Sequence, residues 1–165
     1  MKGEPIPPAK QAEIELKHIQ LELVHGRTNH MRHFVDQYYC FKNVYLNRNG
    51  GARWEAVVWG GVVSTAARAL ANRKQVVKEH VVPLRVITSE LVAAKEAGHT
   101  SLSAIAEILD RLTHFGTITK EEDKRLRDAG LNQAMPHGFF EQGHSNYGDI
   151  LSRYREVGIE IECSL

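Results

Sequence analysis

The sequence predicts a mainly helical protein, a compact single-domain bundle of six or seven helices with at most a small two- or three-stranded element. Three observations support this prediction. Apolar residues recur at helical spacing along most of the chain, helix-capping residues stand between these segments, and β-branched runs are few and short. The 165 residues are 42% hydrophobic and 25% charged, as in an average globular domain. This composition excludes a disordered tail, a collagen and a disulfide-rich miniprotein.

The N-terminal part is expected to be helical after a short lead-in. Residues 1–8 contain three prolines, so we predict a flexible segment there and a single domain over residues 9–165. Helical spacing of apolar residues predicts amphipathic helices over residues 10–24 and 28–46. Alternating apolar residues near the end of the first helix leave a strand open as an alternative. Residues 47–51, rich in Asn and Gly, predict a turn.

The middle of the chain is rich in small and β-branched residues. Residues 54–72 predict one helix or two short ones, because Gly60 and Gly61 each cost about 1 kcal/mol inside a helix. If the helix is continuous, we expect these glycines to allow the close approach of another backbone. The β-branched run over residues 76–83 ends in proline, and it predicts either a short strand or the end of a helix.

Capping signals define the elements that follow. Gly98 is expected to end a helix, Thr100 or Ser101 to begin the next, and Thr119 with Glu122 forms the Thr-x-x-Glu pattern of a capping box. The predicted elements are helices over 84–97, 101–112, 119–130 and 149–157, an extended piece over 117–119, a loop over 135–147 and a strand end over 159–162.

The net charge of +1 hides an uneven distribution of charge. The total excludes binding of nucleic acid by bulk positive charge alone. Between residues 68 and 85, however, Glu79 is the only acid among several basic residues. A local phosphate-binding face is therefore predicted, although a solvated helix face explains the same run. Its residues are Arg68, Lys74, Lys78 and Arg85, together with Arg73.

Histidine is frequent, with nine residues, and one group has the spacing of metal ligands. His30, His33 and Asp36 follow one another at intervals of three, so on a helix they project from one side. Two imidazoles and a carboxylate suit zinc or a similar divalent ion. An ordinary polar helix face is the alternative interpretation of the same series.

Glu79 and His80 stand at the end of the β-branched run, directly before Val-Val-Pro. This segment, Val76–Pro83, resembles the first element of the ββα-metal motif of HNH nucleases. The resemblance implies that His80 activates water and that Glu79 helps to bind a divalent metal. The chain departs from the family because it lacks the Asn of the following loop and the cysteine pairs that bind a structural metal. Without those parts Glu79 and His80 are half of such a site.

Two further resemblances concern overlapping parts of the chain. Arg73 and His80 resemble the Arg-x(4–6)-His pattern of HEPN-type ribonucleases, which implies that the arginine stabilises the phosphate. The pattern from Lys78 to Ile161 is similar to uncharacterised proteins of prophages and plasmids, and this implies a mobile-element setting in phage–host conflict or DNA upkeep. No activity is carried over from that similarity.

Two functions from different classes follow from these observations. In the first, the chain acts on nucleic acid as a small nuclease or nuclease relative, with His80 as base, Glu79 as metal ligand or orienter and Arg73 as phosphate clamp. In the second, a non-catalytic protein masks a protein or nucleic-acid partner through basic and aromatic contacts. Whether the chain is an enzyme stays open. Convergence of Arg73, Glu79 and His80 in a cleft would favour catalysis, and a buried His80 would disfavour it. The aromatic candidates are Trp54, Trp59, Tyr147 and Tyr154.

The expected location is the cytoplasm. The N-terminal residues lack the apolar core of a secretory signal, and no stretch is long and apolar enough to span a membrane. Cys40 and Cys163 are far apart, which fits a reducing compartment, with Cys40 buried and Cys163 exposed. The sequence makes no prediction of the oligomeric state.

Overall fold

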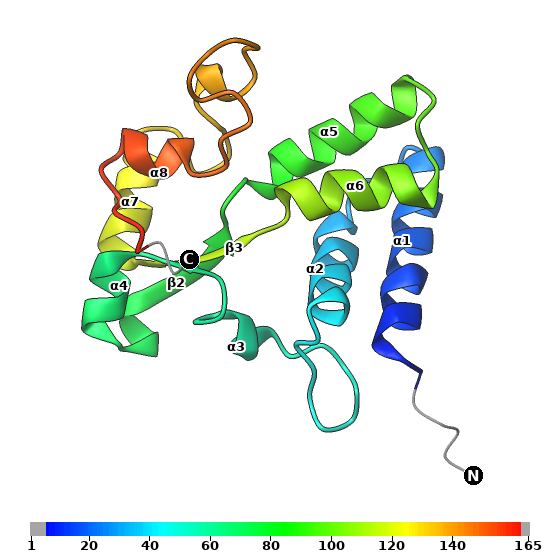
Figure 1. Cartoon of the computed structure of the whole chain (residues 1–165), viewed down its shortest axis with the longest axis horizontal. Coiled ribbons are helices and arrows are strands. Elements are labelled where there is room, and N and C mark those ends of the chain that lie inside the picture. The colour runs from blue at the N-terminus through cyan, green and yellow to red at the C-terminus, as the bar shows by residue number, and fades with distance from the viewer. Residues whose placement is uncertain (1–5, 163–165) are drawn as a thin grey trace. The chain divides into compact units, whose positions relative to one another are not determined.

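The computed structural model describes residues 6–162 and divides the chain into two compact units, each made of two stretches of sequence. Unit 1 combines Met1–Val57 with Ile87–Thr113, and unit 2 combines Val58–Val86 with His114–Leu165. The elements of both are labelled in Figure 1. A single domain over residues 9–165 stays a prediction, and the prediction for Cys163 lies outside the described residues.

Unit 1 consists of helices. In it α1 packs against α2 and α6. Leu21 of α1 is 57% exposed while Ile19 and Leu23 are buried, so the strand alternative for this segment is wrong. The helices are α1 (Pro8–Val24), α2 (Met31–Lys42), α3 (Trp54–Val57), α5 (Leu84–Glu96, whose first three residues belong to unit 2) and α6 (Leu102–Leu112).

The predicted lead-in over residues 1–8 extends one residue too far, because Pro8 is the first residue of α1. Proline is tolerated in the first turn of a helix, where its missing N–H has no helical partner and its fixed φ suits the helix. The N–H groups of Lys10 and Gln11 donate to the Pro7 carbonyl oxygen, which starts the hydrogen-bond ladder. Flexibility of the preceding segment stays a prediction, and its residues 1–5 lie outside the part of the chain that the structure describes.

Unit 2 is built around a three-stranded sheet in the order β1-β3-β2, so β2 is an edge strand. β3 pairs in parallel with β1 and antiparallel with β2, with Val76 opposite Thr119 and His80 opposite Phe115. The run over residues 76–83 therefore contains a strand. The elements of this unit are β1 (Val62–Val63), α4 (Thr65–Leu70), the 3₁₀ turn η1 (Arg73–Gln75), β2 (Val76–His80), β3 (Phe115–Thr119), α7 (Lys120–Asp128), the 3₁₀ turn η2 (His137–Phe139) and α8 (Ser152–Glu156).

The two faces of this sheet cover different apolar clusters. Ile118 of β3 belongs to a cluster with Leu126 of α7 and Tyr154 of α8, whereas Val76 of β2 packs with residues around β1 and α4. Successive side chains of a strand point to opposite faces. Glu79 lies on the face of its neighbour Gly116 and of Ile118, and His80 lies on the other face.

The segment over residues 54–72 forms two short helices, α3 and α4, with β1 between them. The sequence left open one continuous helix or two short ones, and two short helices are what forms. Gly61 also makes the close approach to a backbone that we linked to a continuous helix, since a Cβ atom there would overlap the Phe115 carbonyl oxygen. A glycine is required at this contact because any side chain would displace β3.

The predicted fold class is confirmed in its coarse form. The described residues form eight α-helices and a small three-stranded sheet, so the chain is mainly helical with the minor strand element that the sequence predicts. A pure helical bundle is not what forms, because the sheet organises unit 2. Within residues 6–162 no helix is both long and apolar enough to cross a membrane.

The predicted capping box is present and has a further partner. Glu122 is buried, and its carboxylate accepts hydrogen bonds from the Thr119 N–H at 2.8 Å and from the Ser64 hydroxyl at 2.6 Å. The Ser64 oxygen itself accepts from the Ala67 N–H at the start of α4. One carboxylate therefore joins the first turns of α7 and α4.

Replacement of Glu122 by alanine is expected to lower the free energy of unfolding by about 3 kcal/mol, because two buried donors lose a charged acceptor. Urea unfolding followed by circular dichroism measures this change. Glu121→Ala is the control, since Glu121 is exposed one residue earlier in the same helical turn. Equal midpoints for the two variants would contradict the structural role given to Glu122.

Candidate functional site

The candidate site centres on Glu79, whose carboxylate is occupied by two side chains of α8. Its Oε1 atom lies 2.9 Å from Nη2 of Arg153, and the Tyr154 hydroxyl donates a hydrogen bond to the same oxygen. Gly116, opposite Glu79 in the sheet, leaves the space that the Tyr154 ring enters, because a Cβ atom there would overlap the hydroxyl. Glu79 is thus held from the side of α8.

Arg153 is fully buried and uses its guanidinium to bind backbone as well as Glu79. Nε donates to the Val81 carbonyl at 2.7 Å, Nη1 to the Leu131 carbonyl at 2.7 Å and Nη2 to the His80 carbonyl at 2.5 Å. A buried charge is tolerated only when it is paired and hydrogen-bonded. The arrangement satisfies Arg153 and neutralises Glu79 at the same time.

Burial and charge act against each other on the acid–base properties of this cluster. Burial raises the pKa of Glu79 above its ordinary value of 4.5, against the lowering effects of the Arg153 charge and of the Tyr154 hydrogen bond. Burial, with the Glu79 charge beside it, raises the pKa of Tyr154 well above its usual 10.0. Tyr154 is therefore a neutral donor at physiological pH.

His80 lies in a packed environment on the opposite face of the sheet. Its side chain is 6% exposed, and its ring centroid is 4.6 Å from that of Phe115 across the strand pair. The Lys78 ammonium lies 5.0 Å from the Phe115 ring centroid, which is within cation–π range. His80 therefore has the buried position that we associated with a structural role.

The structure does not bring Arg73, Glu79 and His80 together. Glu79 and His80 are adjacent in β2 and point to opposite faces. Arg73 lies in η1, before the first residue of the strand, and its Nη1 donates to the Val76 carbonyl at 3.4 Å. The proposed base, metal ligand and phosphate clamp thus occupy three different places in unit 2.

The predicted metal ligands are not assembled either. His30 precedes the first residue of α2 and does not have helical geometry, so the interval of three no longer places it above His33. Asp36 is buried, whereas both histidines are exposed. Among the residues that the structure describes, no three or more His, Cys, Asp and Glu side chains form a group able to hold a metal ion.

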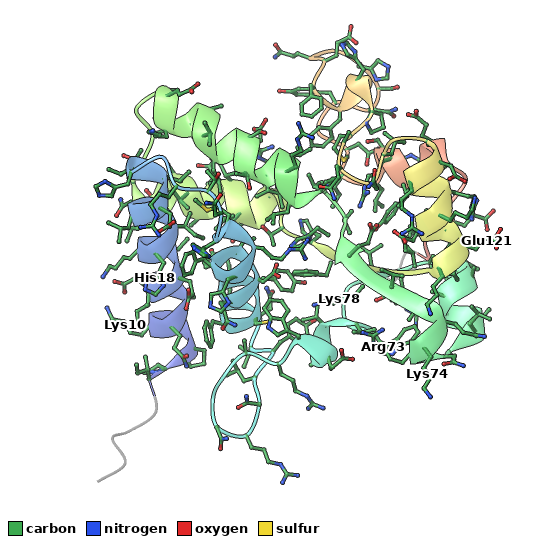
Figure 2. The ribbon with its side chains drawn as sticks, turned by 180° about the vertical axis from the view of Figure 1, so that it is seen from behind. Lys10, His18, Arg73, Lys74, Lys78 and Glu121 are labelled. Carbon is green, nitrogen blue, oxygen red and sulfur yellow. The ribbon has the colours of Figure 1, made fainter. Side chains whose placement is uncertain are left out.

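The predicted phosphate-binding residues form a strip along the edge of the sheet. Figure 2 shows Lys74 and Arg73 of η1 and Lys78 of β2 on the same side of unit 2, and Arg85 is exposed in the first turn of α5. We call these four residues the basic strip. Arg68 lies in α4, outside this strip, and its Nε lies 2.8 Å from a carboxylate oxygen of Glu162, which offsets its charge.

Sequence reasoning missed Arg153 and misjudged Tyr154. Tyr154 was predicted as an aromatic contact for a partner, but it is fully buried, whereas Tyr147 is 56% exposed and Trp59 is also exposed. The two α8 residues pair with Glu79, more than seventy residues earlier, and no local pattern announces that contact. The glycine at position 116 was the available signal, because a glycine inside a strand marks a close approach.

Comparison of the chain with models of protein families, with curated proteins and with solved structures finds no match. The resemblances to HNH nucleases, HEPN-type ribonucleases and prophage proteins therefore stay predictions. A function for this chain is inferred from the geometry of the described residues.

The space above Gly116 provides the first test of this cluster. Gly116→Ala is expected to lower the free energy of unfolding by roughly 2 kcal/mol, because the new methyl group overlaps the buried Tyr154 hydroxyl. In a Tyr154→Phe background the same substitution should cost less, since the overlapping oxygen is gone. Urea unfolding of the four proteins of this cycle measures the coupling. Additive effects would contradict the contact.

The pH dependence of stability tests the burial of Glu79. A folded-state pKa above the unfolded value means that this carboxyl group's contribution to stability is complete below about pH 4.5 and is lost as the pH rises through the folded-state pKa. Relative to Glu79→Gln, the wild type should therefore lose stability as the pH rises above 4.5. Urea unfolding of both proteins between about pH 4 and pH 8 checks this sign. The opposite trend would show that pairing with Arg153 outweighs burial.

Proposed function

We propose that this chain binds nucleic acid through the basic strip and that it does so without cleaving the bound strand. The observation that carries the proposal is the orientation of Glu79. This residue is the only acid between Arg68 and Arg85, and it is turned inward and paired with Arg153. The charged residues of the basic strip itself are therefore cations only, although the chain as a whole is nearly neutral.

Phosphate binding by such a strip rests on ordinary electrostatics. Lysine and arginine side chains that contact phosphates release condensed counterions, so affinity falls steeply as salt is added. The half-buried Lys78 holds its ammonium group over the Phe115 ring, and Lys74 is exposed in the turn before the strand. A short row of cations of this kind supports local contact with a phosphate backbone.

The positions of Glu79 and His80 favour binding over catalysis. A metal ligand needs a carboxylate free to coordinate, whereas that of Glu79 is engaged by Arg153 and Tyr154. A general base must reach the same reacting centre as the metal, whereas His80 is buried on the other face. Masking of a partner, the second function predicted from the sequence, fits this arrangement, and the setting in phage–host conflict stays part of the proposal.

Charge reversal in the basic strip tests the proposal. Fluorescence anisotropy with labelled single- and double-stranded oligonucleotides of about 20 nucleotides, in EDTA, measures affinity over a range of salt concentrations. Lys74→Glu combined with Lys78→Glu is expected to weaken binding by roughly tenfold or more and to make the salt dependence shallower, because about two phosphate contacts are lost.

Lys120→Glu combined with Lys124→Glu is the matched control. Both lysines are exposed on α7, in the same unit but outside the strip, and the two substitutions change the net charge by the same amount as those of the strip variant. It should leave affinity and salt slope nearly unchanged. Equal losses in the control and in the strip variant, or no measurable binding by the wild type at low salt, would overturn the proposal.

A further inference from the structure

A loop of unit 2 presents two aromatic side chains to solvent. We call residues 137–148 the aromatic loop; it begins with η2 and rises beside α8 in Figure 1. Phe140 is 52% exposed and Tyr147 is 56% exposed. Each ring offers a large flat apolar face to solvent, which is the kind of group that interfaces use for contact.

The loop is held in a defined conformation by its own contacts. The Gly148 N–H donates to the Phe139 carbonyl at 3.0 Å, which closes the loop, and the Asn146 N–H donates to Nδ1 of His144 at 3.0 Å. The His144 ring packs so closely on Gly138 that a Cβ atom there would overlap it. Phe139 is buried and anchors the loop. The exposed rings are therefore carried on an ordered base.

The charges of the loop are compatible with a phosphate chain nearby. Asp149, directly after the loop, pairs with Arg155. Glu141 is the one acid within the loop, and its carboxylate lies 3.4 Å from Nδ1 of His137, which offsets the charge only when that histidine is protonated. Partnered carboxylates repel phosphates less than free ones do.

The loop and the basic strip belong to the same unit. Arg153, which follows the loop in α8, donates to the Val81 carbonyl just after β2. Arg85 is only four residues beyond Val81, which limits the separation of their Cα atoms to about 14 Å. The helix that follows the loop is therefore hydrogen-bonded to the short segment that leads to Arg85.

We propose that Phe140 and Tyr147 stack on unpaired bases, so that the nucleic acid bound by the basic strip is single-stranded. This inference rests on the proposed function and adds the class of ligand. Flat aromatic rings beside a cationic track are what single strands require, because every base has a face that can stack. In a duplex the bases are already stacked and unavailable to the rings.

Anisotropy with single- and double-stranded oligonucleotides of equal length tests the inference. Phe140→Ala and Tyr147→Ala should each lower the affinity for single strands by roughly fivefold to a hundredfold and leave duplex affinity nearly unchanged. Phe140→Tyr and Tyr147→Phe keep a ring and should retain binding. Leu70→Ala removes another exposed apolar side chain of unit 2 and is the control for loss of apolar surface.

The outcomes separate this inference from the proposed function. Equal affinity for both oligonucleotides, unaffected by the loop variants but reduced by charge reversal in the strip, overturns the inference and leaves the function standing. An equal loss for single strands and duplexes in the alanine variants also overturns it. Absence of binding to either oligonucleotide overturns both. A wild type that binds neither and forms a dimer in light scattering, which the alanine variants return to monomer, would assign the loop to protein docking.

Discussion

The arrangement of unit 2 depends on one buried guanidinium. Arg153 binds the carbonyl oxygens of His80, Val81 and Leu131 and the carboxylate of Glu79. Through these contacts α8 is joined both to the end of β2 and to the segment that follows α7. A charge in such a place is stable only while its partners remain, because removal of one leaves another unpaired in a medium of low polarity. The Tyr154 hydroxyl and the space above Gly116 complete the same cluster.

This constraint decides which groups of β2 are available for function. Pairing with Arg153 removes the acid of the 68–85 segment from the surface, and the alternation of the strand buries His80 on the opposite face. The exposed charged side chains of residues 68–85 are therefore cations, namely Arg68, Arg73, Lys74 and Arg85, and Lys78 of the strand itself is half-buried. The arginines at its two ends also donate to β2 carbonyls, Arg73 to Val76 and Arg153 to His80, which satisfies acceptors of an edge strand. Both features support the proposal that this segment binds a phosphate chain.

Sequence patterns within a few residues predict much of the fold but little of the candidate site. The Thr119–Glu122 capping box and the close approach at Gly61 both follow from residue chemistry within a few positions. The orientations of Glu79 and His80 depend instead on the register between β2 and β3, and the partner of Glu79 comes from a helix far along the chain. No periodicity encodes such a pairing. For that reason the sequence alone could not place Arg73, Glu79 and His80 relative to one another, whereas the basic run was readable because it is contiguous.

The central claim is that Glu79 has a structural role and that β2 is part of a surface that binds without catalysis. A cleavage screen tests it most directly, with the purified full chain, single- and double-stranded DNA and RNA, and Mg²⁺, Mn²⁺, Zn²⁺ or EDTA. The account predicts intact substrates under every condition. Metal-dependent cleavage that disappears in Glu79→Gln or His80→Ala, with the fold preserved in circular dichroism, would contradict it.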